Sequence, residues 1–127
     1  MTNKIQREAT VSTPSILFDF ENNDFLISGE SYPEDVNDFY DPVLVPFAEY
    51  LDAAEGVKIR FEVRLIYFNS TTSRILLDFI ERLDGAAKRD NQVKIVWAYA
   101  KDDDNMEEFG EEFEEDIEAA EFELAPY

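Results

Sequence analysis

The sequence predicts a two-layer α/β fold (α+β in its layering), in which helices pack mainly on one face of a mixed β-sheet. Strand-like and helix-like segments follow one another in the order β-β-α-β-α-β-α-β within 127 residues, the size of one domain. The segment Val57–Phe68 alternates apolar and charged side chains, which is typical of a strand with one buried face. Strands that alternate with helices favour parallel neighbours, whereas the first two strands are close enough for a hairpin.

The first strands are expected after Pro14. We expect residues 1–14 to form a flexible leader, because they are polar and unpatterned, and residues 15–127 to form a single domain. The segment Ser15–Glu21 alternates with period two, residues 22–24 (Asn-Asn-Asp) are typical of a turn, and Phe25–Ser28 is again strand-like. Together these segments predict a β-hairpin.

A helix is expected next. Ser31 and Glu34 have the spacing of a capping box, in which a hydroxyl and a carboxylate bind backbone N–H groups of the first turn. Because Pro42 and Pro46 each lack an N–H group, we expect a loose first segment followed by a firmer one. Gly56 is expected to end this region.

The strand Val57–Phe68 is the clearest in the sequence. One face is apolar, formed by Val57, Ile59, Phe61, Val63, Leu65 and Tyr67. The other face is charged, formed by Lys58, Arg60, Glu62 and Arg64. One face should therefore lie in the core, while the other is at least partly exposed to solvent.

The second half of the chain continues the alternation of helix and strand. An amphipathic helix carries apolar residues at helical spacing, Ile75, Leu76, Phe79, Ile80 and Leu83, and should end near Gly85 or in the basic stretch after it. Gln92–Ala100 is strand-like. Residues 102–105 (Asp-Asp-Asp-Asn) cap an acidic helix with Met106, Phe109, Phe113 and Ile117 as its apolar positions. Glu121–Leu124 is a last short strand.

The composition excludes much catalytic chemistry. The chain has no cysteine and no histidine, so thiolate metal sites, histidine bases and Ser-His or Cys-His pairs are impossible. The acidic residues 102–118 lack the alternating ligands and central glycine of an EF-hand. We therefore expect no enzyme, no cofactor and no metal site, with a small carboxylate-based hydrolase or lyase as the alternative.

The formal net charge of −19 limits the possible partners. Nucleic acids and anionic membranes would be repelled, and a basic protein surface is the natural complement, although high charge also serves solubility alone. The sequence shows neither the long apolar run of a membrane helix nor the apolar core of a signal peptide. We expect a cytoplasmic protein.

Hydroxyl side chains gather after the central strand. Asn69 is followed by Ser70, Thr71, Thr72 and Ser73 at the start of the best amphipathic helix. Helix capping explains such a run, because Ser and Thr satisfy free N–H groups there. The alternative is that one hydroxyl accepts a phosphoryl group, whose charge the helix N-terminus would tolerate.

Two short motifs carry a resemblance to known proteins. The strand–loop–helix order with a hydroxyl after the central strand is similar to STAS-type anti-sigma factor antagonists. More closely, residues 29–34 (Gly-Glu-Ser-Tyr-Pro-Glu), residues 67–73 (Tyr-Phe-Asn-Ser-Thr-Thr-Ser) and the acidic last helix resemble the SiaC family of bacterial regulatory phosphoproteins. The likeness extends from about Ser15 onward and implies a STAS-like fold.

The resemblance implies a partner-switching protein without catalytic activity of its own. A cognate kinase would phosphorylate it, a PP2C-type phosphatase would remove the phosphate, and the unphosphorylated form would bind and activate a diguanylate cyclase. An anti-sigma factor antagonist that binds a sigma-sequestering kinase is the alternative partner switch, and an assembly protein without phosphorylation is another.

Carried onto this sequence, the phosphoacceptor falls on Ser70, where the family usually has threonine, and Thr71 is the second choice. The other residues of the expected switch and partner-binding region are Asn69, Thr71, Thr72, Ser73, Ser31, Tyr32, Pro33 and Glu34. For the Ser31–Glu34 turn, helix capping and partner binding are equally good explanations.

Overall fold

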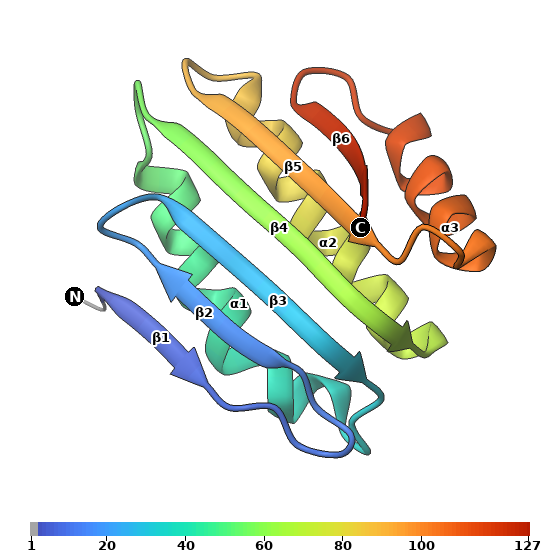
Figure 1. Ribbon diagram of the computed structural model, residues 1–127. Helices are drawn as coiled ribbons and strands as arrows, with labels where there is room; N and C mark the ends of the chain where they lie inside the picture. The colour runs from blue at the N-terminus through green and yellow to red at the C-terminus, as the bar shows by residue number, and fades with distance from the viewer. Residues whose placement is uncertain (1–2) are drawn as a thin grey trace.

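The computed structural model describes residues 3–127, and within them the chain forms six strands and three helices (Figure 1). In chain order these are β1 (Lys4–Arg7), β2 (Ser15–Asp19), β3 (Asp24–Ser31), α1 (Val36–Ala53), β4 (Lys58–Phe68), α2 (Ser70–Ala87), β5 (Gln92–Tyr99), α3 (Asp104–Glu115) and β6 (Glu121–Pro126).

The strands lie side by side in the same order as in the chain, β1-β2-β3-β4-β5-β6. The pairs β1–β2 and β2–β3 are antiparallel, while β3–β4, β4–β5 and β5–β6 are parallel. A crossover of constant hand puts its helix on the same face each time the chain advances in the same direction across a sheet. Figure 1 shows α1 and α2 behind the sheet and α3 at its β5–β6 side, so the predicted mixed sheet with helices mainly on one face is confirmed.

The core lies between the sheet and the two helices behind it. Its centre is a cluster of fully buried phenylalanine rings, Phe18, Phe25, Phe47, Phe61 and Phe79. The rings of Phe18 and Phe47 are 5.3 Å apart and those of Phe61 and Phe79 are 5.4 Å apart, distances at which aromatic pairs attract beyond simple burial. This cluster fixes α1 and α2 against the strands that precede them.

A strand was missed in the N-terminal segment. Lys4–Arg7 forms β1 and pairs antiparallel with β2, with Ile5 opposite Phe18. The expected flexible leader is therefore wrong for these residues, and the element order is β-β-β-α-β-α-β-α-β. Ile5 is the strand's single apolar side chain, which left no alternation to detect in the sequence.

Helix α1 begins later than expected. Its N-cap is Asp35, whose carboxylate accepts the N–H of Asp38 at 3.1 Å. Ser31 is the last residue of β3 and is fully buried. The capping box of Ser31 and Glu34 is therefore wrong, because the side chain that meets the free N–H groups is Asp35.

Helix α1 also continues through both prolines. The expected loose first segment is absent within Val36–Ala53, although Pro42 and Pro46 lie inside the helix. Each proline removes one hydrogen bond. The buried side of the helix offsets this loss through tertiary packing, with Tyr40, Val43, Leu44, Phe47 and Leu51.

The alternation of β4 breaks before the strand ends. Gly29 pairs with Leu65 and Glu30 pairs with Tyr67, so Ile66 is an extra residue that forms a bulge. Gly29 has a φ of 106°, a conformation that favours glycine. The predicted apolar face is wrong at its end, because Tyr67 is half exposed and its neighbour Phe68 is buried.

Other element boundaries differ by a few residues. Strand β2 ends at Asp19, β3 continues to Ser31, and β6 continues to Pro126. Helix α2 passes Gly85 to end at Ala87, beside the basic stretch, while α3 ends at Glu115 and leaves Ile117 outside it. Among residues 3–127, no helix is both long and apolar enough to cross a membrane.

Candidate functional site

The junction between β4 and α2 lies at the carboxyl edge of the parallel strands, where the sequence predicts a site. Asn69 is the N-cap of α2, and its Oδ1 accepts the N–H of Thr72 at 3.0 Å and the hydroxyl of Thr71 at 2.9 Å. Capping is therefore done by the asparagine rather than by the hydroxyl run after it. Ser70 is the first residue of the helix, and its side chain is exposed.

The hydroxyl groups of the run differ in access. Ser70 and Thr71 are exposed, but the Thr71 hydroxyl is bound to the Asn69 cap, whereas no hydrogen bond to the Ser70 hydroxyl occurs within residues 3–127. Thr72 is fully buried. Ser73 is half-buried, and its N–H donates to the carbonyl of Asn69 at 3.0 Å. A protein that approaches from solvent meets Ser70 and Thr71 first.

Thr72 belongs to a buried hydroxyl network with Ser31 and Tyr40. The Oγ atoms of Ser31 and Thr72 are 2.9 Å apart, and Ser31 Oγ is 2.7 Å from Tyr40 Oη. Because Thr72 donates to the Ser31 carbonyl at 3.1 Å, a consistent arrangement has Ser31 donating to Thr72 and Tyr40 donating to Ser31. Burial raises the pKa of Tyr40 to about 12, so it stays a neutral donor. The network fastens the end of β3 and the body of α1 to the start of α2.

The two sequence motifs meet at this edge. The N–H of Asn69 donates to the carbonyl of Ser31 at 3.2 Å, and the ring of Tyr32 packs edge-on against Tyr67 with 5.8 Å between centroids. Pro33 is buried, whereas Glu34 is exposed in the loop before α1. The structure thus joins Ser31 to the hydroxyl run and Tyr32 to Tyr67 just before it, and it leaves Glu34 at the surface.

Sequence reasoning missed Tyr40. Its hydroxyl lies on the otherwise apolar stripe of α1, and a buried tyrosine usually requires a polar partner. That requirement was the available signal, but it did not indicate which partner would meet it.

The acidic helix α3 begins at the same edge. Asp103 is its N-cap and accepts the N–H of Met106 at 3.1 Å. Negative charge in the first turn is favourable, whereas the last turn carries no basic residue to match the helix dipole. Among residues 3–127, no group of three or more acidic side chains is arranged to hold a metal ion.

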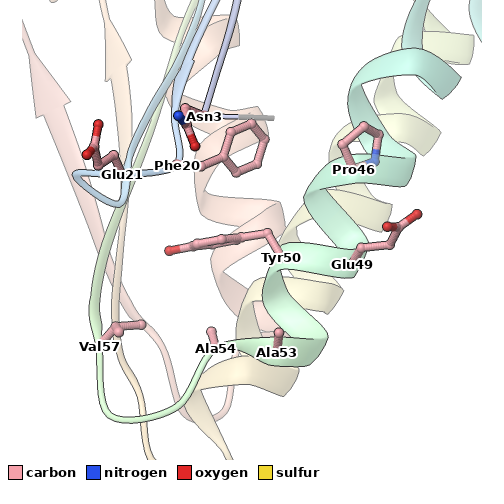
Figure 2. Close-up of a pocket in the computed structure, with 9 residues that line it drawn as sticks. All are labelled: Asn3, Phe20, Glu21, Pro46, Glu49, Tyr50, Ala53, Ala54 and Val57. Atoms are coloured by element: carbon pink, nitrogen blue, oxygen red, sulfur yellow. The ribbon is translucent and has the colours of Figure 1, made fainter. Parts of the chain in front are cut away.

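A cavity lies away from this edge, between the end of α1 and the turn after β2 (Figure 2). It has a volume of about 660 Å³, and apolar side chains such as Phe20, Tyr50 and Val57 line it. The Tyr50 hydroxyl donates to Asn23, and burial raises its pKa to about 12. Figure 2 shows the carboxylates of Glu21 and Glu49 directed away from Tyr50, so they do not converge as acid and base.

Comparison with known proteins decides the family. Residues 7–127 match the family model described as SiaC family regulatory phosphoprotein. The chain belongs to the SiaC family. The resemblance found in the sequence is thereby confirmed, and the chain is a SiaC family regulatory protein.

Solved structures of SiaC proteins share this fold. Apo-SiaC from Pseudomonas aeruginosa is 25% identical, with a TM-score of 0.84 over 97% of this chain and 100% of that chain. A second structure, from the same species, contains SiaC in complex with the diguanylate cyclase SiaD, which it activates. This SiaC is also 25% identical, with a TM-score of 0.90 over 97% of this chain and 99% of that chain.

A sequence relative is an uncharacterized protein of Pseudomonas aeruginosa strain UCBPP-PA14, which is 29% identical over 108 residues, 84% of each chain.

Proposed function

We propose that this SiaC family member is a non-enzymatic, cytoplasmic regulator that binds and activates a diguanylate cyclase while Ser70 is unphosphorylated. A cognate kinase adds the phosphate and a PP2C-type phosphatase removes it. The observation that carries the proposal is the exposed Ser70 hydroxyl at the first position of α2, in a fold that matches a SiaC bound to the cyclase it activates.

The environment of each hydroxyl favours Ser70 over its neighbours. Thr71 is second, because its hydroxyl would first have to leave the Asn69 cap. Thr72 is disfavoured, since phosphorylation would require opening the network with Ser31 and Tyr40. Ser73 is half-buried and lies further into the helix.

The start of α2 suits a phosphoryl group. The first N–H groups of a helix lack intrahelical partners, and the helix dipole favours negative charge there. Asn69 uses the N–H of Thr72, so the N–H groups of Ser70 and Thr71 can face a phosphate. Phosphorylation would thus add about two negative charges at this edge without unfolding the helix.

Mass spectrometry of the protein purified from its native host tests the proposal. With phosphatase inhibition, we expect a phosphate on the peptide that contains Ser70, and we expect Ser70→Ala to remove it while Thr71→Ala retains it. A phosphate that persists in Ser70→Ala and disappears in Thr71→Ala would move the acceptor by one residue.

The partner is tested with the diguanylate cyclases encoded by the same host. Wild type and Ser70→Ala should bind one of them and raise its output of cyclic di-GMP, whereas the phosphorylated protein should not. No phosphate under any growth condition, or no cyclase activated, would overturn the proposal. Recovery of a sigma factor and its sequestering kinase instead would favour an anti-sigma factor antagonist.

A further inference from the structure

Three exposed side chains, Ile66, Tyr67 and Tyr127, together with the half-buried Tyr32, form a largely apolar surface at the carboxyl edge of the sheet. We call it the aromatic row and define it as Tyr32, Ile66, Tyr67 and Tyr127. Ile66 is 63% exposed, and Tyr67 and Tyr127 are each 50% exposed. The bulge in β4 explains the exposure of Tyr67, which it turns away from the core. Ile66 continues the outward face of β4 that Arg60 and Arg64 begin.

Backbone pairing aligns the members of the row. Tyr67 pairs with Glu30 on β3. Tyr32 follows the end of β3, and its ring packs against that of Tyr67. At the other end, the N–H of Tyr127 donates to the carbonyl of Tyr99 at 2.9 Å, so the chain terminus follows the end of β5. The Arg64 guanidinium lies over the Tyr127 ring at 4.8 Å.

No helix within residues 3–127 covers this face. Helices α1 and α2 lie behind the sheet (Figure 1), and α3 packs against Trp97, whose side chain belongs to the buried core. Much of the same face is occupied by cross-strand ion pairs, such as Lys94 with Glu123 at 2.8 Å. The aromatic row differs in having large apolar side chains exposed together. Contiguous exposed apolar patches rimmed by polar residues are typical of interaction surfaces.

Carboxylates flank the row at both ends. Glu30 and Glu34 lie at the β3 end, and Asp102–Asp104 follow Lys101, whose N–H donates to the Tyr127 carbonyl at 2.9 Å. The nearby cations are Lys101 and Arg64, and Arg64 is engaged by Glu62 at 2.9 Å. The complementary surface is apolar in its centre and basic at its ends.

We propose that the aromatic row is the surface on which the cyclase docks, through an apolar segment flanked by Lys or Arg residues. The inference rests on the proposed function and adds to it the surface and the chemistry of the partner segment.

The location of the row explains the sign of the switch. Ser70 is three residues beyond Tyr67 at the same edge. If the partner's contact were purely basic, a phosphate on Ser70 would strengthen binding. An apolar segment laid over this edge would instead have to remove water from a dianion, which is costly. Phosphorylation therefore releases the partner.

Affinity measurements on single variants test the surface. Ile66→Asp and Tyr67→Ala should weaken binding to the host cyclase by about tenfold or more, since both change exposed centres of the contact. Val45→Asp is the matched control, because Val45 is 54% exposed on α1, and it should bind like wild type. Raising NaCl from about 50 to about 300 mM should weaken wild-type binding, because the flanking charges are exposed.

Each result separates this inference from the proposed function. If wild type activates a cyclase while Ile66→Asp and Tyr67→Ala bind it normally, the docking surface is wrong and the proposed function stands. If no host cyclase binds wild type, both are overturned. Light scattering that shows a wild-type dimer made monomeric by Ile66→Asp would make the row a self-interface and overturn the inference. Thermal unfolding of each variant checks that the fold is retained.

Discussion

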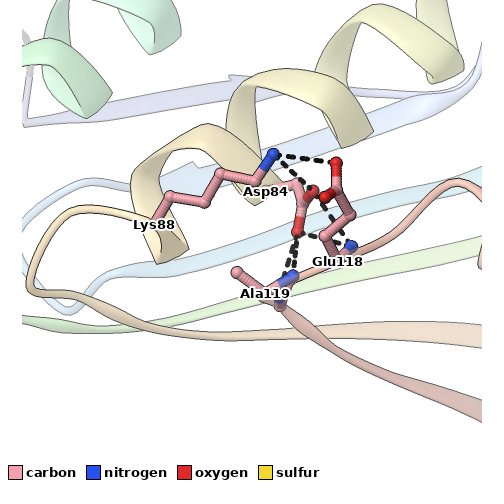
Figure 3. Close-up of polar contacts among 5 residues, drawn as sticks. Asp84, Lys88, Glu118 and Ala119 are labelled. Carbon is pink, nitrogen blue, oxygen red and sulfur yellow. Dashed lines mark hydrogen bonds and ion pairs between the residues drawn. The ribbon is translucent and has the colours of Figure 1, made fainter.

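Asp84 holds the loop between α3 and β6 in place. Its carboxylate accepts the N–H groups of Ala119 at 2.8 Å, Ala120 at 2.9 Å and Glu118 at 3.1 Å, as Figure 3 shows in part. Lys88 lies 3.8 Å from the same carboxylate. Burial disfavours the charged form, but the three N–H donors and Lys88 outweigh it and hold the pKa of Asp84 below its ordinary value.

Replacing this carboxylate should destabilise the protein. Asp84→Asn keeps the shape but presents an amide NH₂ group to backbone donors, so we expect a loss of about 1–3 kcal/mol in the free energy of unfolding, measured by urea denaturation at pH 7. Asp78→Asn on the same helix is the control. Asp78 pairs with Arg82 at the surface, with 40% and 43% of the two side chains exposed, and should change stability by less than about 1 kcal/mol.

The lowered pKa of Asp84 predicts how the stability difference between wild type and Asp84→Asn changes with pH. A carboxylate with a lowered folded pKa contributes its full stability above the unfolded pKa of about 3.9 and loses it as the pH falls through the folded value. The stability difference between wild type and Asp84→Asn should therefore be constant near neutrality and narrow below about pH 4. A difference that stays constant down to about pH 3 would contradict the role of the Asp84 charge.

Single residues at the site were predictable where the chain order decides their position. Ser70 follows the central strand, so its location at the sheet edge could be predicted. Ser31 could not be assigned, because a hydroxyl before a helix suits both a cap and a buried network. Only the folded chain shows that Tyr40 and Thr72 bind it, nine and 41 residues away in sequence.

Helix α3 packs against the sheet through a glycine. A Cβ atom on Gly110 would lie 2.5 Å from Cδ1 of Trp97 and 2.6 Å from Cδ2 of Leu124, closer than such atoms approach. Trp97 Nε1 also donates to the carbonyl of Met106 at 2.9 Å, which fixes the indole against the same helix. The helix can approach β5 and β6 this closely only because Gly110 has no side chain.

Gly110→Ala separates helix propensity from packing. Alanine favours a helix over glycine by up to about 1 kcal/mol, but the contact with Trp97 should outweigh this gain and destabilise the protein by about 1–3 kcal/mol. Gly85→Ala is the matched control, because a Cβ there meets nothing within 4 Å, and it should stabilise. Urea denaturation and the fluorescence of Trp97, the single tryptophan, measure both. Equal gains in the two variants would contradict close packing of α3.

Helices and strands could be predicted where the pattern of apolar residues within the element itself identifies it. The alternation in Val57–Phe68 identifies β4, and the helical spacing of Ile75 to Leu83 identifies α2. The bulge at Ile66 is set by pairing with β3, so the sequence of β4 alone does not contain it. The continuity of α1 through Pro42 likewise depends on packing against the sheet.

The architecture of the whole molecule follows from the order of its elements. Helices between successive strands lead to parallel pairs and to one covered face, and both were expected. Strand β1 was not expected, because pairing with β2 holds it in place and it has only one apolar residue to indicate a strand. Strand register could not be predicted from the sequence either, so the exposure of Tyr67, which depends on the bulge in β4, was not foreseen.

The charge of the whole molecule should make its stability rise with salt. Thirty acidic residues oppose eleven basic ones, so repulsion exceeds attraction, although ion pairs such as Lys94 with Glu123 act in the other direction. Salt screens the repulsion and the ion pairs alike, and the stronger of the two effects decides whether stability rises or falls with salt.

Raising NaCl from about 20 to about 300 mM at pH 7 should therefore raise the thermal midpoint by several degrees, about 4 °C for each kcal/mol gained in the free energy of unfolding. Near pH 4, where carboxylates are partly protonated, the rise should shrink or vanish. A midpoint that falls with NaCl at pH 7 would mean that the ion pairs outweigh the repulsion.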